Sequence, residues 1–175
     1  GKTKVIIDNA AYLYSQNKIS ALVVIAPNGV HRNWLDKEIP EHMPDWCPVR
    51  CVYYYSGMHK THKAKFDEIM SSEDCLRVFS FNVEAFVSNN AVAIMNRILL
   101  SNKAMLIVDE SSRIKRPGAK RTKTITKFAK HSDYRRIMTG TPVTKGPEDV
   151  YSQFKFLDPN ILGYDSFYSF KARYC

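Results

Sequence analysis

The sequence has few cysteines and no long hydrophobic run, and both shortages exclude classes of protein. Only four cysteines are scattered over 175 residues, so a small secreted fold held together by disulfides is not expected. The longest apolar runs, Ala21–Ala26 and Ala104–Val108, are far shorter than the ~20 residues of a membrane-spanning helix. We therefore expect a protein of a reducing intracellular compartment, the cytoplasm or the nucleus or nucleoid, with no membrane partner.

Repeats, low-complexity stretches and Pro- or Gly-rich linkers are also missing. Apolar residues make up 45% of the chain and charged residues 25%, which excludes a disordered or collagen-like protein. A chain of this length suits one domain with a sizeable core. We expect residues 1–175 to form a single lobe.

Acidic residues are nearly absent from one segment, residues 113–136. The segment holds ten Lys and Arg residues and a single Asp, and it carries the whole net charge of +9 because the rest of the chain is balanced. One concentrated basic strip predicts a polyanion as partner. The alternative is a solvated face that meets an acidic partner domain.

Two cysteines and two histidines lie close enough in sequence to suggest zinc: Cys47, Cys51, His59 and His62. However, Val49 to Tyr55 has the composition of a strand, and four strand residues span about 13 Å. Zn–S bonds are only about 2.3 Å long, so both thiolates reach one ion only if this run is a turn. We predict no structural zinc.

Short apolar runs alternate with helical patterns along the chain. Strands are expected at residues 21–26, 49–55, 76–81, 104–108 and 134–138, and helices at 4–17, 30–39, 59–70, 91–100, 119–130 and 147–156. This alternation predicts an α/β fold, a parallel sheet with helices on both faces. Ligands of such sheets bind at the carboxyl ends of the strands, where the turns 27–29, 80–82, 109–110 and 139–142 are expected.

The chain opens with Gly1, Lys2 and Thr3 and runs directly into a helix. These residues match the end of the phosphate-binding pattern G-x-x-x-x-G-K-[ST], in which the Lys neutralises phosphate oxygens and the Thr hydroxyl holds Mg²⁺. Three residues are weak evidence alone. On this interpretation the chain begins inside the loop.

Asp109 and Glu110 follow a buried strand. At such a position an Asp can hold Mg²⁺, and the neighbouring Glu can orient or deprotonate a water that attacks phosphate. A helix N-cap is the alternative, and the presence of Gly-Lys-Thr favours the catalytic interpretation. Thr139-Gly140-Thr141-Pro142 follows the fifth strand and, alone, would be read as an ordinary turn.

Taken in order, these motifs resemble the first motor lobe of superfamily-two helicases, in particular the Swi/Snf branch. The matching segments are Gly1-Lys-Thr3, Val24-Ile-Ala-Pro-Asn28 with Trp34 and Glu38, Ile107-Val-Asp-Glu110, Met138-Thr-Gly-Thr-Pro142 and the tail Tyr151 to Pro159. The resemblance covers essentially the whole chain. It implies a RecA-like P-loop NTPase lobe whose second lobe is absent here, so the fragment alone should be inactive.

The resemblance also implies roles for individual residues. Lys2, Asp109 and Glu110 would be catalytic, Gly1, Lys2 and Thr3 would bind the phosphates of ATP, and Thr3 and Asp109 would hold Mg²⁺. Ser112, Thr139, Gly140 and Thr141 would couple hydrolysis to movement, although many relatives carry His where this chain has Ser112. The implied partners are duplex DNA, contacted through its backbone without sequence preference, and the second lobe.

The expected helix 119–130 places its lysines on one side. Lys120, Lys123, Lys127 and Lys130 fall within an arc of about 80°, opposite the apolar residues, as expected of a helix that faces phosphates. The residues that we expect to contact DNA, from the resemblance and from this strip, are Asn28, Arg32, Arg113, Lys115, Arg116, Lys120, Lys123 and Lys127.

Two other functions remain open at this point. The chain could be a nucleic-acid-binding module that keeps the fold without the activity, or a lobe of an RNA helicase. The intact Lys2 and Asp109-Glu110 disfavour the first, and Thr139 to Pro142 weakly disfavours the second. The compact sequence suggests a viral or bacterial source.

Overall fold

The computed structural model describes residues 1–175 and contains one five-stranded sheet in which every strand pair is parallel. The strands are β1 (Ala21–Ala26), β2 (Val49–Tyr53), β3 (Leu76–Asn82), β4 (Ala104–Asp109) and β5 (Tyr134–Met138), in the spatial order β2-β3-β1-β4-β5. The expected α/β class is confirmed. All five predicted strands are present, with ends that differ by at most two residues.

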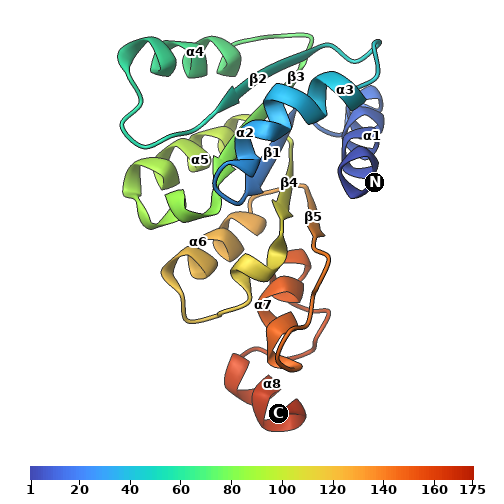
Figure 1. The fold of residues 1–175 in the computed structure, drawn as a ribbon, viewed down its shortest axis with the longest axis vertical. Coiled ribbons are helices and arrows are strands. Elements are labelled where there is room, and N and C mark those ends of the chain that lie inside the picture. Colours follow the sequence, from blue (N-terminus) through green and yellow to red (C-terminus); the bar gives the residue numbers. More distant parts are fainter.

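Helices cover both faces of the sheet (Figure 1). One face carries α1 (Lys2–Ser15) and the helical segment formed by α2 (Val30–Asn33), the π-helical turn η1 (Trp34–Glu38) and α3 (Ile39–His42). The other carries α4 (Lys60–Met70), α5 (Asn89–Ser101) and α6 (Lys120–Ala129). The chain continues into α7 (Glu148–Leu157) and α8 (Phe167–Tyr174), and the short 3₁₀ turns η2 (Val83–Val87) and η3 (Ser111–Ile114) follow β3 and β4.

The central strand β1 explains why its sequence is apolar at every position. Val23 and Ile25 point into a core with α4, α5 and α6, whereas Leu22 and Val24 point into a second core with α1. All six β1 residues are buried. A strand covered on both faces has no solvent side for polar residues, so the usual alternation disappears.

The helix expected at residues 30–39 is present but is not a regular α-helix. Trp34–Glu38 forms a π-helical turn between α2 and α3, and Trp34 is only 1% exposed. π-Turns are rare and often mark functional positions. No local sequence pattern had indicated this turn.

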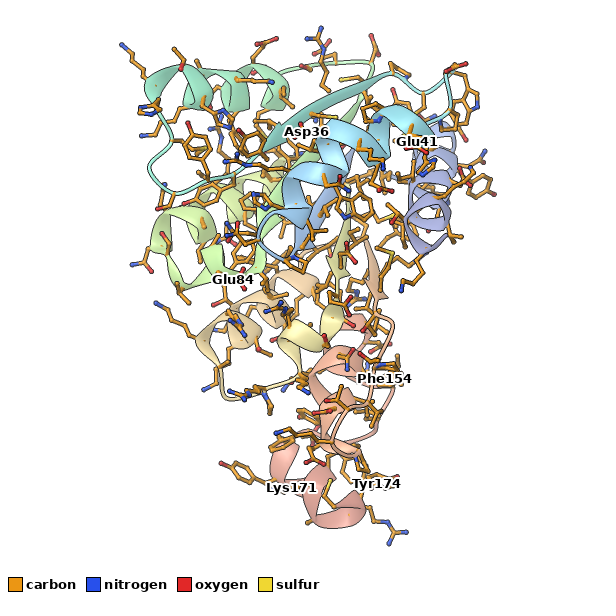
Figure 2. The ribbon with its side chains drawn as sticks, in the orientation of Figure 1. Asp36, Glu41, Glu84, Phe154, Lys171 and Tyr174 are labelled. Atoms are coloured by element: carbon orange, nitrogen blue, oxygen red, sulfur yellow. The ribbon has the colours of Figure 1, made fainter.

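The last helix, α8, was not expected from the sequence. Its N-cap Ser166 accepts a hydrogen bond from Ser169 N, and Phe170 packs against the ring of Tyr151 on α7. Figure 2 shows Lys171 and Tyr174 at this end of the molecule, opposite the end that holds Asp36 and Glu41. α8 therefore extends the α7 side of the fold and does not cover the sheet.

The four cysteines are free thiols. Burial raises the pKa of Cys47 and of Cys51 to about 11. The nearby His62 is engaged elsewhere, because its Nε2 lies 2.7 Å from the carbonyl oxygen of Tyr53. None of the helices combines the length and the apolar character needed to cross a bilayer.

His31 is an unusual buried residue. It is 2% exposed, and neither ring nitrogen has a hydrogen-bond partner. Burial lowers the pKa of His31, and the charge of the adjacent Arg32 lowers it further. The folded protein therefore holds this imidazole in its neutral form.

We predict that acidification destabilises the fold through His31. The unfolded chain takes up a proton near the ordinary pKa of 6.5 while the folded protein resists it, so the free energy of unfolding falls from pH 7 to pH 5. Chemical denaturation across this range measures the fall. His31→Phe should flatten the profile, and the exposed control His131→Asn should not; an equally steep profile for His31→Phe would contradict the prediction.

Candidate nucleotide and nucleic-acid site

The carboxyl edge of the sheet brings the first residues of the chain to the turns that follow β4 and β5. A β-carbon built on Gly140 would lie 3.7 Å from Lys2 Nζ, so the Lys2 ammonium sits directly against the backbone after β5. The charge of Lys2 is also close enough to Asp109 to lower the pKa of its carboxyl. In sequence, Lys2 is 107 residues from Asp109 and 138 residues from Gly140. The fold thus brings all three to one place.

Asp109, the last residue of β4, is held by an indole. Trp34 Nε1 donates a hydrogen bond of 2.9 Å to Asp109 Oδ2. Burial raises the pKa of Asp109, and this effect outweighs the Trp34 hydrogen bond and the Lys2 charge, which lower it. The result is a partly desolvated carboxylate with a defined orientation beside a cation.

Glu110 adopts a left-handed backbone conformation, with φ 54° and ψ 59°. This conformation costs a residue with a β-carbon about 1–2 kcal/mol. Thr139 Oγ1 donates a 2.7 Å hydrogen bond to Glu110 Oε1. The side chain is therefore tied to the turn after β5, and the two conspicuous motifs of the sequence are in direct contact.

Gln153 on α7 links the same two turns from behind. Ser111 Oγ donates to Gln153 Oε1 at 2.5 Å, and Gln153 Nε2 donates to the carbonyl oxygen of Pro142 at 2.8 Å. Both Ser111 and Gln153 are at most 1% exposed. The turn after β4 and the loop after β5 are thus joined through one buried amide.

Asp149, also on α7, organises the rest of that loop. It accepts hydrogen bonds from the Thr144 hydroxyl, from the Thr144 and Lys145 backbone N–H groups and from Lys115 Nζ. These bonds, led by that of the Thr144 hydroxyl, hold the pKa of Asp149 well below its usual range. Asp149 is thus a structural carboxylate whose negative charge is stabilised by hydrogen bonds within the fold.

The first residues fit phosphate and magnesium in their chemistry. Gly1 is the N-cap of α1, Lys2 is exposed, and the first turn contains no acidic residue. A helix start with a lysine and no competing carboxylate attracts phosphate. The Thr3 hydroxyl and the Asp109 carboxylate are oxygen donors of the kind that Mg²⁺ prefers.

The expected DNA contacts at the end of β1 are on the surface. Asn28 and Arg32 are both exposed, and the Arg32 guanidinium stacks over the Tyr53 ring at 4.7 Å. Gly29 between them has φ 84°, a conformation that glycine adopts without strain. The turn therefore presents polar groups beside the nucleotide motifs.

The basic strip divides into exposed and internally bonded members. Arg113, Arg116, Lys123 and Lys127 are exposed. Lys115 differs from the expectation, because its ammonium is bonded to Asp149 and Thr144 within the fold.

Lys120 begins the row of lysines on α6. It is exposed and donates a 2.8 Å hydrogen bond to the carbonyl oxygen of Val87. The buried side of the same helix is formed by Thr122, Ile125, Phe128 and Ala129. The predicted division of α6 into an apolar back and a lysine front is confirmed.

The remaining coupling candidates lie around the Thr139–Glu110 contact. Ser112 is half-buried in η3, next to Ser111. Thr141 is exposed, and its backbone N–H donates to Thr139 Oγ1 at 3.1 Å. The Thr139 hydroxyl thus joins its own turn to Glu110.

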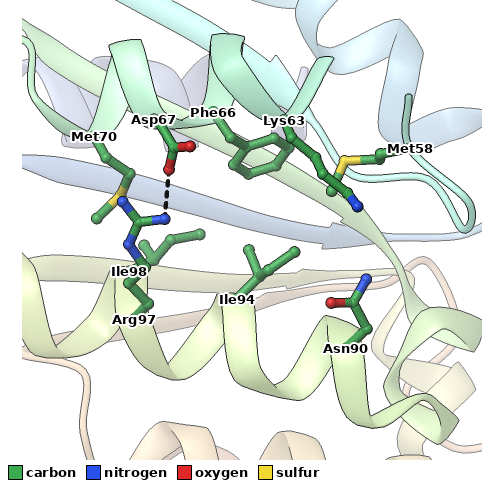
Figure 3. Close-up of a pocket in the computed structure, with 9 residues that line it drawn as sticks. All are labelled: Met58, Lys63, Phe66, Asp67, Met70, Asn90, Ile94, Arg97 and Ile98. Atoms are coloured by element: carbon green, nitrogen blue, oxygen red, sulfur yellow. Dashed lines mark hydrogen bonds and ion pairs between the residues drawn. The ribbon is translucent and has the colours of Figure 1, made fainter. Parts of the chain in front are cut away.

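A separate cavity of about 280 Å³ lies between α4 and α5 (Figure 3). Met58, Phe66 and Ile94 contribute to its lining, and the Arg97–Asp67 ion pair bridges it at 2.5 Å. It shares no residue with the site at the carboxyl edge. The cavity therefore does not bear on the chemistry described above.

Sequence reasoning missed three residues that shape this site: Trp34, Asp149 and Gln153. Trp34 bonds to Asp109 75 residues away, Gln153 to Ser111 42 residues away, and Asp149 accepts from Lys115 34 residues away, so no local pattern identifies these contacts. Trp34 and Gln153 had only their place in segments of the resemblance as a signal, and the buried face of α7 also holds the polar residues Asp149 and Ser152.

We predict that Asp109→Asn raises the thermal stability of the protein. Because the folded state raises the pKa of Asp109, ionised Asp109 lowers the free energy of unfolding at neutral pH, and a neutral amide removes that cost. Asn Oδ1 can still accept from Trp34. Differential scanning calorimetry at pH 7 tests this, with Asp36→Asn, an exposed site, as control; an unchanged or lower Tm for Asp109→Asn would contradict it.

Comparisons with known proteins identify the family of this chain. The model of the SNF2-related domain family matches residues 1–174. The Schizosaccharomyces pombe SWI/SNF chromatin-remodeling complex subunit snf22 is 30% identical over 165 residues, which cover 93% of this chain and 9% of that protein. The Danio rerio chromodomain-helicase-DNA-binding protein 1-like is 27% identical over 164 residues, 93% of this chain and 15% of the relative.

The fold is also that of a solved structure. The Sulfolobus solfataricus SWI2/SNF2 ATPase core in complex with dsDNA matches 98% of this chain and 32% of its own, with a TM-score of 0.69 and 22% identity. The chain thus spans 9–15% of the two curated relatives and about a third of the solved chain. With a family model matching nearly every residue, the resemblance found in the motifs is confirmed, and the chain belongs to the SNF2-related domain family.

Proposed function

We propose that this chain is the ATP-binding first lobe of a Swi/Snf-type motor that couples ATP hydrolysis to movement along duplex DNA. The observation that carries the proposal is the convergence of Lys2, Asp109 and Glu110 at one edge of the sheet. A relative named as a chromatin-remodeling subunit and a fold shared with a dsDNA-bound ATPase core support it.

The chemistry is phosphoryl transfer from ATP to water. Lys2 and the N-terminus of α1 would neutralise the phosphate oxygens, and Thr3 and Asp109 would hold Mg²⁺. When bound there, Mg²⁺ would supply neutralisation of phosphate charge. Glu110 orients the attacking water and accepts its proton, and Thr139 holds the Glu110 carboxylate in place.

The DNA backbone would lie across the exposed residues beside this site. Asn28 and Arg32 sit at the carboxyl end of β1, and Arg113 and Arg116 lie between the Glu110 turn and α6. Movement of Glu110 or Thr139 on hydrolysis would reach these residues through short segments of chain. This is the proposed route from ATP to DNA, in which Ser112, Gly140 and Thr141 take part.

A second lobe would complete the ATPase site. Lys2 and Gly140 are exposed, so the nucleotide site is open on one side, and arginines from a second lobe would close it. We therefore expect negligible turnover from residues 1–175 alone. Four free cysteines suit a reducing compartment, which we propose as the place of action.

We predict that Glu110→Gln in the full-length protein lowers the ATPase rate at least 100-fold and leaves ATP binding largely intact, because the amide cannot accept the proton of the attacking water. Steady-state ATPase assays with duplex DNA, single-stranded DNA and RNA measure both the loss and the preference. Stimulation by duplex DNA is expected. An active Glu110→Gln variant would favour the alternative of a nucleic-acid-binding module without this catalysis. Stimulation by RNA alone would identify an RNA helicase.

We predict that Lys120→Glu, Lys123→Glu and Lys127→Glu together sharply reduce DNA-stimulated ATPase activity in the full-length protein. Three lost phosphate contacts should also lower the slope of log affinity against log salt by about 2–3. DNA titrations at several salt concentrations measure this slope. The matched control reverses three exposed lysines elsewhere, Lys18, Lys37 and Lys103; equal losses in both triple variants would remove α6 from the DNA path.

A further inference from the structure

The left-handed backbone of Glu110 must be enforced by its surroundings. Residues with a β-carbon keep such a conformation only where neighbouring contacts hold them there, and such residues cluster at functional sites. The residue before it, Asp109, is fixed in β4 and by Trp34. The direction of the Glu110 carboxylate therefore depends on the contact that fixes the residue after Glu110.

That contact comes from α7. Ser111, the next residue, is fully buried, and its hydroxyl donates to Gln153 Oε1 at 2.5 Å. Gln153 Nε2 donates onward to the carbonyl oxygen of Pro142 and to that of Asp149 within α7, both at 2.8 Å. Every polar atom of the Gln153 side chain is used, so the amide is held in one orientation.

The two ends of this amide hold the same two segments that the Thr139–Glu110 bond joins. Ser111 follows Glu110 directly, and Pro142 lies three residues after Thr139. A Gln side chain can accept from a hydroxyl and donate to a carbonyl at once, whereas Leu can do neither and Glu cannot donate when ionised. The choice of Gln at this buried position matches the two groups that it meets.

We propose that Gln153 is a positioning residue for hydrolysis: by fixing Ser111 and Pro142 together it holds Glu110 in its left-handed conformation and its carboxylate against Thr139. The inference rests on the proposed function of Glu110. Gln153 is buried and acts through Ser111 and Pro142. It makes α7 a third structural part of the site, in addition to the turns after β4 and β5.

The test uses the full-length protein with Gln153→Leu, a substitution of similar size that removes both bonds. A displaced Glu110 should lower kcat roughly 10-fold because a small misplacement of a catalytic group is costly, whereas the KM for ATP should change less than twofold because Lys2 and Thr3 are untouched. Ser111→Ala should have a similar effect. The double variant should be no worse than Gln153→Leu, since both changes break the same bond.

Ser152→Ala is the matched control. Ser152 is as buried as Gln153, lies beside it on α7, and its hydroxyl has no hydrogen-bond partner. It should retain the wild-type kcat. If Gln153→Leu fails to fold, Ser111→Ala decides, because it removes the same bond with a smaller change.

Three outcomes overturn the inference. A wild-type kcat per folded molecule in Gln153→Leu or, where that variant does not fold, in Ser111→Ala would make Gln153 a packing residue, even if Tm falls. Additive losses in the double variant would show that the two residues act separately. If the wild-type protein shows no ATPase activity, or if Glu110→Gln is fully active, the proposed function fails and the inference fails with it. If the wild type is active, Glu110→Gln is inactive and Gln153→Leu is unaffected, only the inference is overturned.

Discussion

The common direction of all five strands is the constraint on which the rest of this structure depends. Because every pair in the order β2-β3-β1-β4-β5 is parallel, every strand delivers its following turn to the same edge. Glu110 and Thr139 therefore become hydrogen-bonded neighbours although helix α6 separates them in sequence. The start of α1 reaches the same edge, so a lysine and a pair of carboxylates share one site.

Asp109 and Asp149 lie in different surroundings near this edge, and the difference suits them to different roles. Asp149 accepts several hydrogen bonds, its pKa is depressed, and its charge stabilises a loop. Asp109 is desolvated with fewer compensating donors, and its pKa is raised. A carboxylate that stays charged although this lowers the stability of the fold is typical of a functional site that binds a cation. A carboxylate whose hydrogen bonds are all made within the fold is typical of a structural role. This contrast supports the proposal that Asp109, rather than Asp149, holds the metal ion.

The positive charge of the chain is likewise divided by the fold. The segment 113–136 reads as one basic strip, yet Lys115 is bonded inside the fold and Arg135 and Arg136 lie half-buried on the edge strand β5. The lysines of α6 remain exposed because its other side is anchored by Ile125 and Phe128. The available surface for a polyanion is therefore narrower than the sequence implies, and it begins beside the nucleotide site.

The sequence by itself determined the strands, six of the helical segments, the α/β class and the nucleotide motifs, because apolar runs and short motifs are local properties of a chain. The tertiary structure alone decided the π-turn at Trp34, the left-handed Glu110, the helix α8 and the partners of Lys115. It also decided the roles of Trp34 and Gln153, whose partners lie 75 and 42 residues away. Such contacts depend on which elements the sheet brings together, and no periodicity within a single segment encodes that.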